Sequence, residues 1–298
     1  MKYTLFFTAI ALCGASPLHN SNSRITNGNP ATDFQYPYMV SLQELSLLQF
    51  ATRGHKCGGV LITYQHVLTA ASCFFRAVNT SLVQASANEF RVFGGSANLT
   101  NDVFQDRVRF IANVTIHPEY IGFPSLVNNI AIVTLQVPFA NTTVSPIGIP
   151  TDNFVPADFA LCTVAGWGST NLNEQASAQL RYTIKYIYNQ DLCTTIYNTV
   201  PYISNIFPSM ICAASYDILS AGCNGDHGNA LVCNGGLTGI LSVSNNCEAS
   251  SYPEVYTRVS NYTTWITSVT GAAYTFRPDL MFYLIFVLIQ IVTIKVIS

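Results

Sequence analysis

Cysteine and histidine are the residue types in this chain whose spacing relates most directly to chemistry. The 298 residues include nine cysteines and five histidines. Cys13 lies in an apolar segment at the amino terminus, which leaves eight cysteines for the rest of the chain. Pairs of the Cys-x-x-Cys or His-x-x-x-His type do not occur, so the sequence favours disulfide bonds over a zinc site. We expect no metal and no cofactor, and the sequence alone leaves the cysteine pairing open.

The amino terminus has the features of a secretory signal peptide in the required order. Lys2 supplies a positive charge, residues 3–13 form a short apolar run, and residues 13–16 are small. We expect a signal peptide over residues 1–15 and a short propeptide over residues 16–24. The alternative for this segment is a buried strand or helix.

The carboxyl terminus is a second apolar segment. Residues 280–294 carry no charge, and a spanning helix needs about 20 apolar residues. Residues 271–273 are small and residues 274–279 form a spacer, an order typical of a lipid-anchor signal. We expect residues 271–298 to be a hydrophobic tail that makes the membrane a partner. A lipid anchor and a transmembrane segment both stay open, and a buried or soluble helix is the third alternative.

Composition and acceptor sites indicate an exported glycoprotein. Only 9% of residues are charged and the formal net charge is -2, so no basic surface is expected and nucleic acid is excluded as a partner. Disulfide bonds are typical of exported proteins. Asn-x-Ser/Thr acceptors for glycosylation occur at Asn79, Asn98, Asn113, Asn141 and Asn261.

Short runs of β-branched and aromatic residues recur along the chain, each bounded by Gly, Pro, Asn or Ser. This pattern favours an all-β barrel or sandwich. One helix is expected over residues 262–269, with Asn261 as its capping residue. The expected strands include residues 38–42, 60–63, 90–93, 130–135, 163–166 and 239–243.

Several segments resemble, in the same order, the sequence markers of the chymotrypsin-like serine proteases, the peptidase S1 family. The segments are residues 24–28, 57–62, 67–73, 129–135, 165–168, 223–233, 253–259 and 265–266. The resemblance implies an all-β fold of two six-stranded antiparallel barrels, the trypsin-like fold, with a short C-terminal helix. It implies a domain over residues 25–270 with the active site between the barrels.

The resemblance also implies a pairing for all eight cysteines. The implied disulfides are Cys57–Cys73, Cys162–Cys233, Cys193–Cys212 and Cys223–Cys247. No cysteine outside the signal peptide is left over, which supports the family resemblance independently of the catalytic segments.

Serine protease chemistry needs a hydroxyl nucleophile, an imidazole that takes its proton, and a carboxylate that orients the imidazole. The resemblance places Ser72 where the family has the histidine, Asn129 where it has the aspartate, and His227 where it has the serine. The catalytic groups act as a unit, so their losses are not additive. We therefore expect a protein that is not an enzyme, with no intact catalytic triad.

Ser72 and His227 leave one enzymatic alternative, because they are a serine and a histidine with exchanged positions. Ser72 would act as the nucleophile and His227 as the base across the cleft. The resemblance assigns the oxyanion site to the backbone N–H groups of Gly225 and His227, which are aimed at a point beside His227. An oxyanion formed on Ser72 would lie elsewhere, so the expected geometry argues against this alternative.

The specificity pocket implied by the resemblance also differs from the family. Ala221 stands at its base, Ser242 and Ser244 on one wall, and Glu254 replaces a glycine on the opposite wall. We expect the side chains of Ser244 and Glu254 to narrow the pocket. Two alternatives stay open for Glu254: it turns to solvent, because burying an unpaired carboxylate is costly, or it favours a basic side chain in a residual pocket.

The groups that the family uses for activation are present. Arg24 precedes Ile25 at the implied cleavage site, and Asp226 stands where the family pairs a carboxylate with the new amino terminus. One hypothesis is that cleavage after Arg24 changes a binding surface. The other is that Asp226 only keeps its loop ordered, since buried charges need partners.

Taken together, the sequence predicts an extracellular serine protease homologue, tethered to the membrane by its tail. Its expected partner is a protein, namely a protease, an inhibitor or a receptor, and its expected role is that of adaptor, decoy or regulator. The alternatives are a serine-type endopeptidase with a rearranged Ser72/His227 site and a surface structural or recognition protein.

Overall fold

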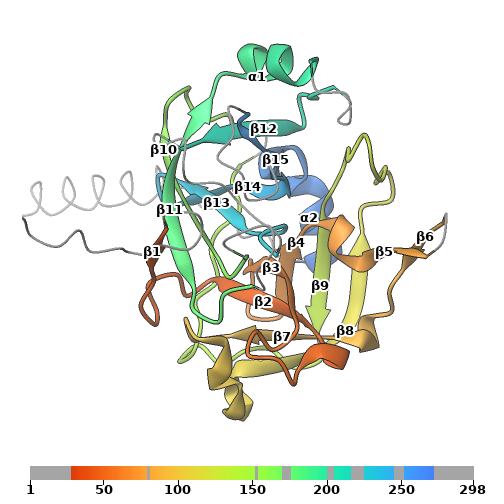
Figure 1. Ribbon diagram of the computed structural model, residues 1–298, viewed down its shortest axis with the longest axis vertical. Helices are drawn as coiled ribbons and strands as arrows, with labels where there is room; N and C mark the ends of the chain where they lie inside the picture. The colour runs from red at the N-terminus through yellow and green to blue at the C-terminus, as the bar shows by residue number, and fades with distance from the viewer. Residues whose placement is uncertain are drawn as a thin grey trace, which may run out of the picture.

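The computed structural model of the protein describes residues 28–78, 81–151, 154–169, 176–199, 205–215, 225–244 and 252–271. Within these ranges the chain forms antiparallel strands with two short α-helices (Figure 1). No helix among the described residues is long and apolar enough to cross a membrane.

The first six-stranded barrel lies in the amino-terminal half of the chain. It closes in the order β2-β3-β4-β9-β8-β7, and every neighbouring pair is antiparallel. The bounds are Met39–Glu44 for β2, His55–Leu61 for β3, His66–Thr69 for β4, Phe90–Gly94 for β7, Val108–Ile116 for β8 and Ala131–Leu135 for β9. A separate hairpin outside the barrel joins β5 (Phe75–Val78) to β6 (Ser81–Gln84).

The second barrel is built from six strands of the carboxyl-terminal half. Its strands follow the order β10-β13-β14-β15-β12-β11, and the pairing of β11 with β10 closes the ring. The short strand β1 (Asn29–Pro30) adds to the edge of β11. The bounds are Leu161–Gly166 for β10, Arg181–Tyr188 for β11, Met210–Ala214 for β12, Ala230–Cys233 for β13, Gly236–Val243 for β14 and Glu254–Arg258 for β15.

Apolar side chains fill both barrels, as closure of a small barrel requires. Val60, Leu68 and Ile132 are completely buried in the first barrel, and Leu241 and Tyr256 in the second. The predicted all-β fold of two six-stranded antiparallel barrels is therefore confirmed, and the predicted strand runs lie within or overlap β2, β3, β7, β9, β10 and β14.

The two α-helices differ in how far the sequence revealed them. The predicted carboxyl-terminal helix is α2 (Thr263–Thr270). Its expected cap was wrong, because Tyr262 rather than Asn261 occupies the N-cap position and makes no side-chain capping bond. The helix α1 (Gln190–Tyr197) was not predicted, although Asn189 caps it by accepting hydrogen bonds from two backbone N–H groups.

The barrels contact each other along the segments expected to carry the site. The backbone N–H of Gly58 in β3 donates to the carbonyl oxygen of His227, which precedes β13, at 2.8 Å. The indole N–H of the buried Trp167, after β10, donates to the carbonyl oxygen of Ala97 at 2.9 Å. These bonds fix the relative position of the side chains described next.

Candidate functional site

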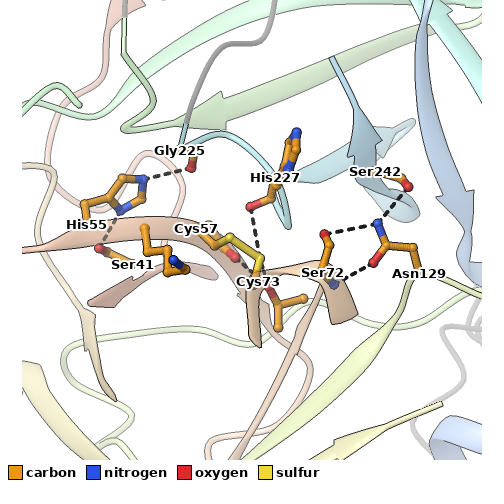
Figure 2. Close-up of a disulfide and its surroundings, with 12 residues drawn as sticks. Ser41, His55, Cys57, Ser72, Cys73, Asn129, Gly225, His227 and Ser242 are labelled. Carbon is orange, nitrogen blue, oxygen red and sulfur yellow. Dashed lines mark hydrogen bonds between the residues drawn. A yellow bond between two sulfur atoms is a disulfide. The ribbon is translucent and has the colours of Figure 1, made fainter. Parts of the chain in front are cut away.

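Asn129 is the centre of a hydrogen-bonded network between the two barrels (Figure 2). Its side chain is completely buried just before β9. Its Oδ1 accepts from the backbone N–H of Ser72 at 2.8 Å, and its Nδ2 donates to the hydroxyls of Ser72 at 3.2 Å and Ser242 at 2.8 Å. The three bonds fix the orientation of the amide and connect Ser72 of the first barrel to Ser242 on β14 of the second.

Ser72 is held in place by its neighbour in the chain. It lies in the 3₁₀ turn Ala71–Phe74, in which Cys73 forms a disulfide with Cys57 of β3. The hydroxyl oxygen of Ser72 accepts its hydrogen bond from Asn129, so its own proton is not used in that bond. Ser72 is therefore a positioned hydroxyl, linked to an amide rather than to an imidazole.

His227 does not contact Ser72 through a hydrogen bond in the described part of the chain. Its carbonyl oxygen lies 3.9 Å from Sγ of Cys73, and its imidazole points away from Ser72 in Figure 2. Burial lowers the pKa of the imidazole below its ordinary value, which favours the neutral form. The hydrogen bond between Ser72 and His227 that the enzymatic alternative would use is therefore not formed in this conformation.

The loop from Gly225 to Gly228 carries the two N–H groups assigned to the oxyanion site. Gly228 has a φ of 84°, and a Cβ there would lie 2.3 Å from the carbonyl oxygen of Gly58, so only glycine fits. The N–H of Gly228 donates to the carbonyl oxygen of Leu241 at 2.9 Å. The loop is therefore tied to both barrels.

His55 is a site residue that the sequence analysis missed. Gly225 offers only a carbonyl oxygen, so Nε2 of His55 carries the proton and donates to it at 2.9 Å, while Nδ1 accepts from the hydroxyl of Ser41 at 2.7 Å. Desolvation lowers the pKa of His55 from 6.5 to about 4. Its position at the start of β3, two residues before Cys57, was the available signal, but only the fold shows that it reaches Gly225.

Asp226 belongs to the same loop, and its side chain is buried. Its Oδ1 accepts from the backbone N–H of Gly168 at 3.0 Å and from Nδ2 of Asn229 at 2.7 Å. Arg24 and Ile25, which the family resemblance relates to Asp226, lie outside the described residues. Asn229 departs from the glycine that the family has beside this loop, but its contact with Asp226 was not predicted.

Glu254 is ion-paired in the interior of the second barrel. It is 3% exposed, and its Oε1 lies 2.8 Å from Nζ of Lys185, which is 2% exposed. Tyr256 donates from its hydroxyl to Oε2 of Glu254, and Lys185 also donates to the hydroxyl of Ser215 at 3.0 Å. The alternative in which Glu254 turns to solvent is therefore wrong, because Lys185, which the sequence analysis did not identify, supplies the opposite charge.

The remaining pocket residues are only partly described. Ser242 is buried and bonded to Asn129, and Ser244 follows the end of β14 with its side chain half-buried. Ala221 lies outside the described residues. The carboxylate of Glu254 is bound to Lys185 within the protein, so it is not presented to a basic ligand side chain in this conformation.

Three of the four implied disulfides are present. They are Cys57–Cys73, Cys162–Cys233 and Cys193–Cys212. Cys223 and Cys247 lie outside the described residues. The described residues contain no group of three or more His, Cys, Asp or Glu side chains that is placed to hold a metal ion.

Four of the five glycosylation acceptors can be located. Asn113, Asn141 and Asn261 are exposed, whereas Asn98 is half-buried and its Oδ1 accepts hydrogen bonds from Thr100. Asn79 lies outside the described residues. The exposed acceptors remain predicted glycosylation sites.

Comparison with known proteins decides the family. A family model described as trypsin matches residues 25–266. The chain belongs to the trypsin family of serine proteases, peptidase S1. Trypsin V-B of Rattus norvegicus is 29% identical over 273 residues, which cover 91% of this chain and 100% of the relative. Trypsin alpha-4 of Lucilia cuprina is 30% identical over 278 residues, which cover 91% and 99%.

A solved structure supports the trypsin-family fold. Neuropsin, a serine protease expressed in the limbic system of mouse brain, aligns with a TM-score of 0.65 and 28% identity. The alignment covers 81% of this chain and 98% of neuropsin. The predicted membership of the S1 family is therefore confirmed.

The comparisons contradict the expectation that the chain is not an enzyme. The relatives matched over nearly their whole length are trypsins, and the structural neighbour is a serine protease. That expectation rested on the side chains at three positions, Ser72, Asn129 and His227, and not on the trypsin-family domain as a whole. It is withdrawn.

Proposed function

We propose that this trypsin-family protein binds an extended segment of another exported protein at the junction of its two barrels, as an adaptor, decoy or regulator of proteolysis. The observation that carries the proposal is the network of Ser72, Asn129 and Ser242. It orders groups from both barrels before any ligand arrives, and such preorganisation lowers the entropy cost of binding.

The segment that would receive the ligand is the end of β14. An extended peptide adds to an exposed strand through backbone hydrogen bonds, while side-chain pockets supply specificity. Asn129 holds Ser242 from inside, and Val243 and Ser244 follow it with half-buried side chains. In the interior of the second barrel, the negative charge of Glu254 is balanced by the positive charge of Lys185. We therefore expect a ligand with a neutral side chain to be favoured over one with a basic side chain.

A test of the proposal uses a peptide library displayed on phage and the folded domain as bait. We expect enrichment of extended peptides with neutral side chains. A Ser244→Pro variant removes one backbone N–H and should weaken binding by about tenfold or more. Ser244→Ala keeps that N–H and serves as the matched control, which should bind as the wild type does.

Peptide hydrolysis by Ser72 is a second candidate function, and it is compatible with binding. It is supported by the trypsin relatives and by the proton of Ser72, which is not used in the bond with Asn129. It is also supported by the lowered pKa of His227, which leaves a neutral imidazole able to accept a proton. The imidazole must rotate toward Ser72 for this reaction. Labelling by a fluorophosphonate that disappears in Ser72→Ala would support this candidate, and the absence of labelling would contradict it.

We also propose that the domain is exposed outside the cell and carried there by the amino-terminal segment. Its disulfide bonds are typical of exported domains. A lipid anchor attached near Gly271 is the form of membrane attachment that we propose for the tail over residues 271–298, because small residues precede a spacer and an apolar end.

A further inference from the structure

The outer side of β10 and β11 carries exposed apolar side chains. Phe159, just before β10, is 64% exposed, Leu161 on β10 is 55% exposed, and Ile184 on β11 is 45% exposed. The strand register pairs Leu161 with Tyr186, and the ring of Phe159 stacks on that of Tyr186 with 6.0 Å between centroids. Paired residues of an antiparallel sheet share a side, as do residues two apart on a strand. These four side chains therefore form one surface, which we call the β10–β11 face.

The pattern of β11 is the reverse of what a strand with one side in water requires. Thr183 and Lys185 are buried, whereas Ile184 is exposed and Tyr186 is half-buried on the outer side. An antiparallel strand at a surface normally has its apolar residues inside and its polar residues in water. A contiguous exposed apolar surface marks an interaction site. The sequence of β11 therefore indicates that a partner covers its outer side.

The glycosylation acceptors leave the second barrel bare. Residues 142–260, which include all six strands of that barrel, contain no Asn-x-Ser/Thr acceptor. Four of the five acceptors precede residue 142, and Asn261 lies just before α2. Glycans are bulky, so a surface without acceptors is the part of an exported domain that another protein can approach most closely.

The helix α2, after which the proposed membrane tail begins, packs against the first barrel. The ring of His117, which follows β8, lies 5.3 Å from the ring of Tyr262 and 5.0 Å from that of Trp265. The β10–β11 face belongs to the second barrel, and β11 lies at the left of the molecule in Figure 1, whereas α2 lies toward the right. These positions favour a protein over the membrane as the partner of this face.

The charge of the face selects which protein fits it. Its four residues are uncharged, so a partner surface that is also apolar and uncharged leaves no charge buried without a counterion. A second copy of the chain presents the same surface by two-fold symmetry. With a formal net charge of -2 for each chain, repulsion between two copies is small.

We propose that two copies of this chain associate through their β10–β11 faces, around a two-fold axis that passes near Leu161. Leu161 lies at the centre of the face, paired with Tyr186 and between Phe159 and Ile184. The proposal goes beyond the proposed binding function and does not rest on it, because the face is remote in sequence from Ser72, Asn129 and Ser242.

Charge substitution at Leu161 tests the association. Full-length chains with two different epitope tags are coexpressed in animal cells, and the fraction of one tag that coprecipitates with the other is measured. With Leu161→Glu in both chains, we expect this fraction to fall by about tenfold or more, because two carboxylates would meet away from water. Leu161→Lys in both chains should lower the fraction by a similar factor.

Coexpression of one Leu161→Glu chain with one Leu161→Lys chain separates a lost contact from a misfolded chain. Opposite charges then meet across the two-fold axis, so coprecipitation should return to at least about half of the wild-type level. Misfolded chains would not recover in the mixed pair. The matched control is Val103→Glu in the 3₁₀ turn Leu99–Val103, because Val103 is 71% exposed and far from the face in sequence. It should coprecipitate as the wild type does.

Three results would overturn the proposal. The first is that wild-type chains with different tags do not coprecipitate. The second is that association persists with the same charge at Leu161 in both chains, or falls equally with Val103→Glu. The third is that the mixed pair of Leu161→Glu and Leu161→Lys associates no better than either variant with itself.

Discussion

Asn129 gives the junction of the barrels a neutral centre. Its amide donates to two hydroxyls and accepts from one backbone N–H, so all three bonds are formed without a charge. A carboxylate at this position accepts hydrogen bonds only, and the hydroxyls of Ser72 and Ser242 would then have to donate to it. The amide therefore determines that the oxygen of Ser72 is the acceptor in this bond, which does not use the Ser72 proton.

Removing this amide should destabilise the protein. Asn129→Ala leaves the backbone N–H of Ser72 and the hydroxyl of the buried Ser242 without this partner, so we expect the free energy of unfolding to fall by about 2–4 kcal/mol. Urea denaturation measures the change. Asn198→Ala, at the exposed end of α1, is the control and should change stability by less than about 0.5 kcal/mol. An equal effect of the two substitutions would contradict the network.

His55 should make the stability of the fold depend on pH. Its pKa is about 4 in the folded protein, below the ordinary value of 6.5, so the unfolded chain binds a proton that the folded chain does not. Above about pH 6.5 His55 is neutral in both states, and its titration does not lower the free energy of unfolding. As the pH falls toward 4, the free energy of unfolding should decrease by about 3 kcal/mol because of this group.

The measurement compares the free energy of unfolding of the wild type and His55→Gln between pH 7 and pH 4, about the range over which His55 titrates. The difference between the two proteins should shrink as the pH falls, because only the wild type loses the contribution of His55. Parallel pH profiles would show that His55 does not titrate in this way.

At the scale of elements, the ion pair of Lys185 and Glu254 links strands that are distant in sequence. Lys185 lies on β11 and Glu254 on β15, and both strands pair with β12. Because the two side chains are almost completely buried, each charge depends on the other, and on the hydrogen bonds that Tyr256 and Ser215 provide.

Removing one charge of this ion pair should lower the free energy of unfolding more than removing both charges. Lys185→Met leaves a buried carboxylate without its cation and should lower the free energy of unfolding by about 3–5 kcal/mol. Adding Glu254→Gln removes the charge but keeps an acceptor for Tyr256, and it should recover more than half of that loss. A double-mutant cycle measured by urea denaturation checks this, and strictly additive losses would be evidence against coupling of the two charges.

The elements differ in how far the sequence revealed them, for physical reasons. Strands such as β9 and β14 were predicted because runs of β-branched residues are a local signal. The contacts of Lys185 with Glu254, of His55 with Gly225 and of Asn229 with Asp226 depend on how strands meet, and only the last pair is close in sequence. The solvent-facing alternative for Glu254 was wrong because the sequence does not show which face of β11 carries Lys185.

At the scale of the whole molecule, the last described helix ends at a defined residue. Gly271 has a φ of 65° at the carboxyl end of α2, and its N–H donates to the carbonyl oxygen of Thr267 at 2.9 Å. A glycine in this conformation terminates a helix. The tail over residues 271–298, for which we propose a lipid anchor, follows this helix in the sequence.

A lipid anchor predicts release of the protein from cells by a phosphatidylinositol-specific phospholipase. When the full chain is expressed in animal cells, enzyme treatment should move the domain into the medium, because the lipid is the attachment. A chain truncated after Gly271 should be found in the medium without treatment. A protein that stays on the cells after treatment and is released only by detergent would contradict the anchor.

The most direct test of the proposed function measures binding and cleavage together. The wild-type domain, Ser244→Pro and Ser244→Ala are titrated with a peptide selected from the library, and the peptide is then analysed for hydrolysis by mass spectrometry. We predict that the wild type and Ser244→Ala bind it equally. Ser244→Pro should bind at least about tenfold more weakly, because the ligand pairs with the backbone after β14. Equal binding by all three proteins, or no peptide bound by the wild type, would contradict the proposal.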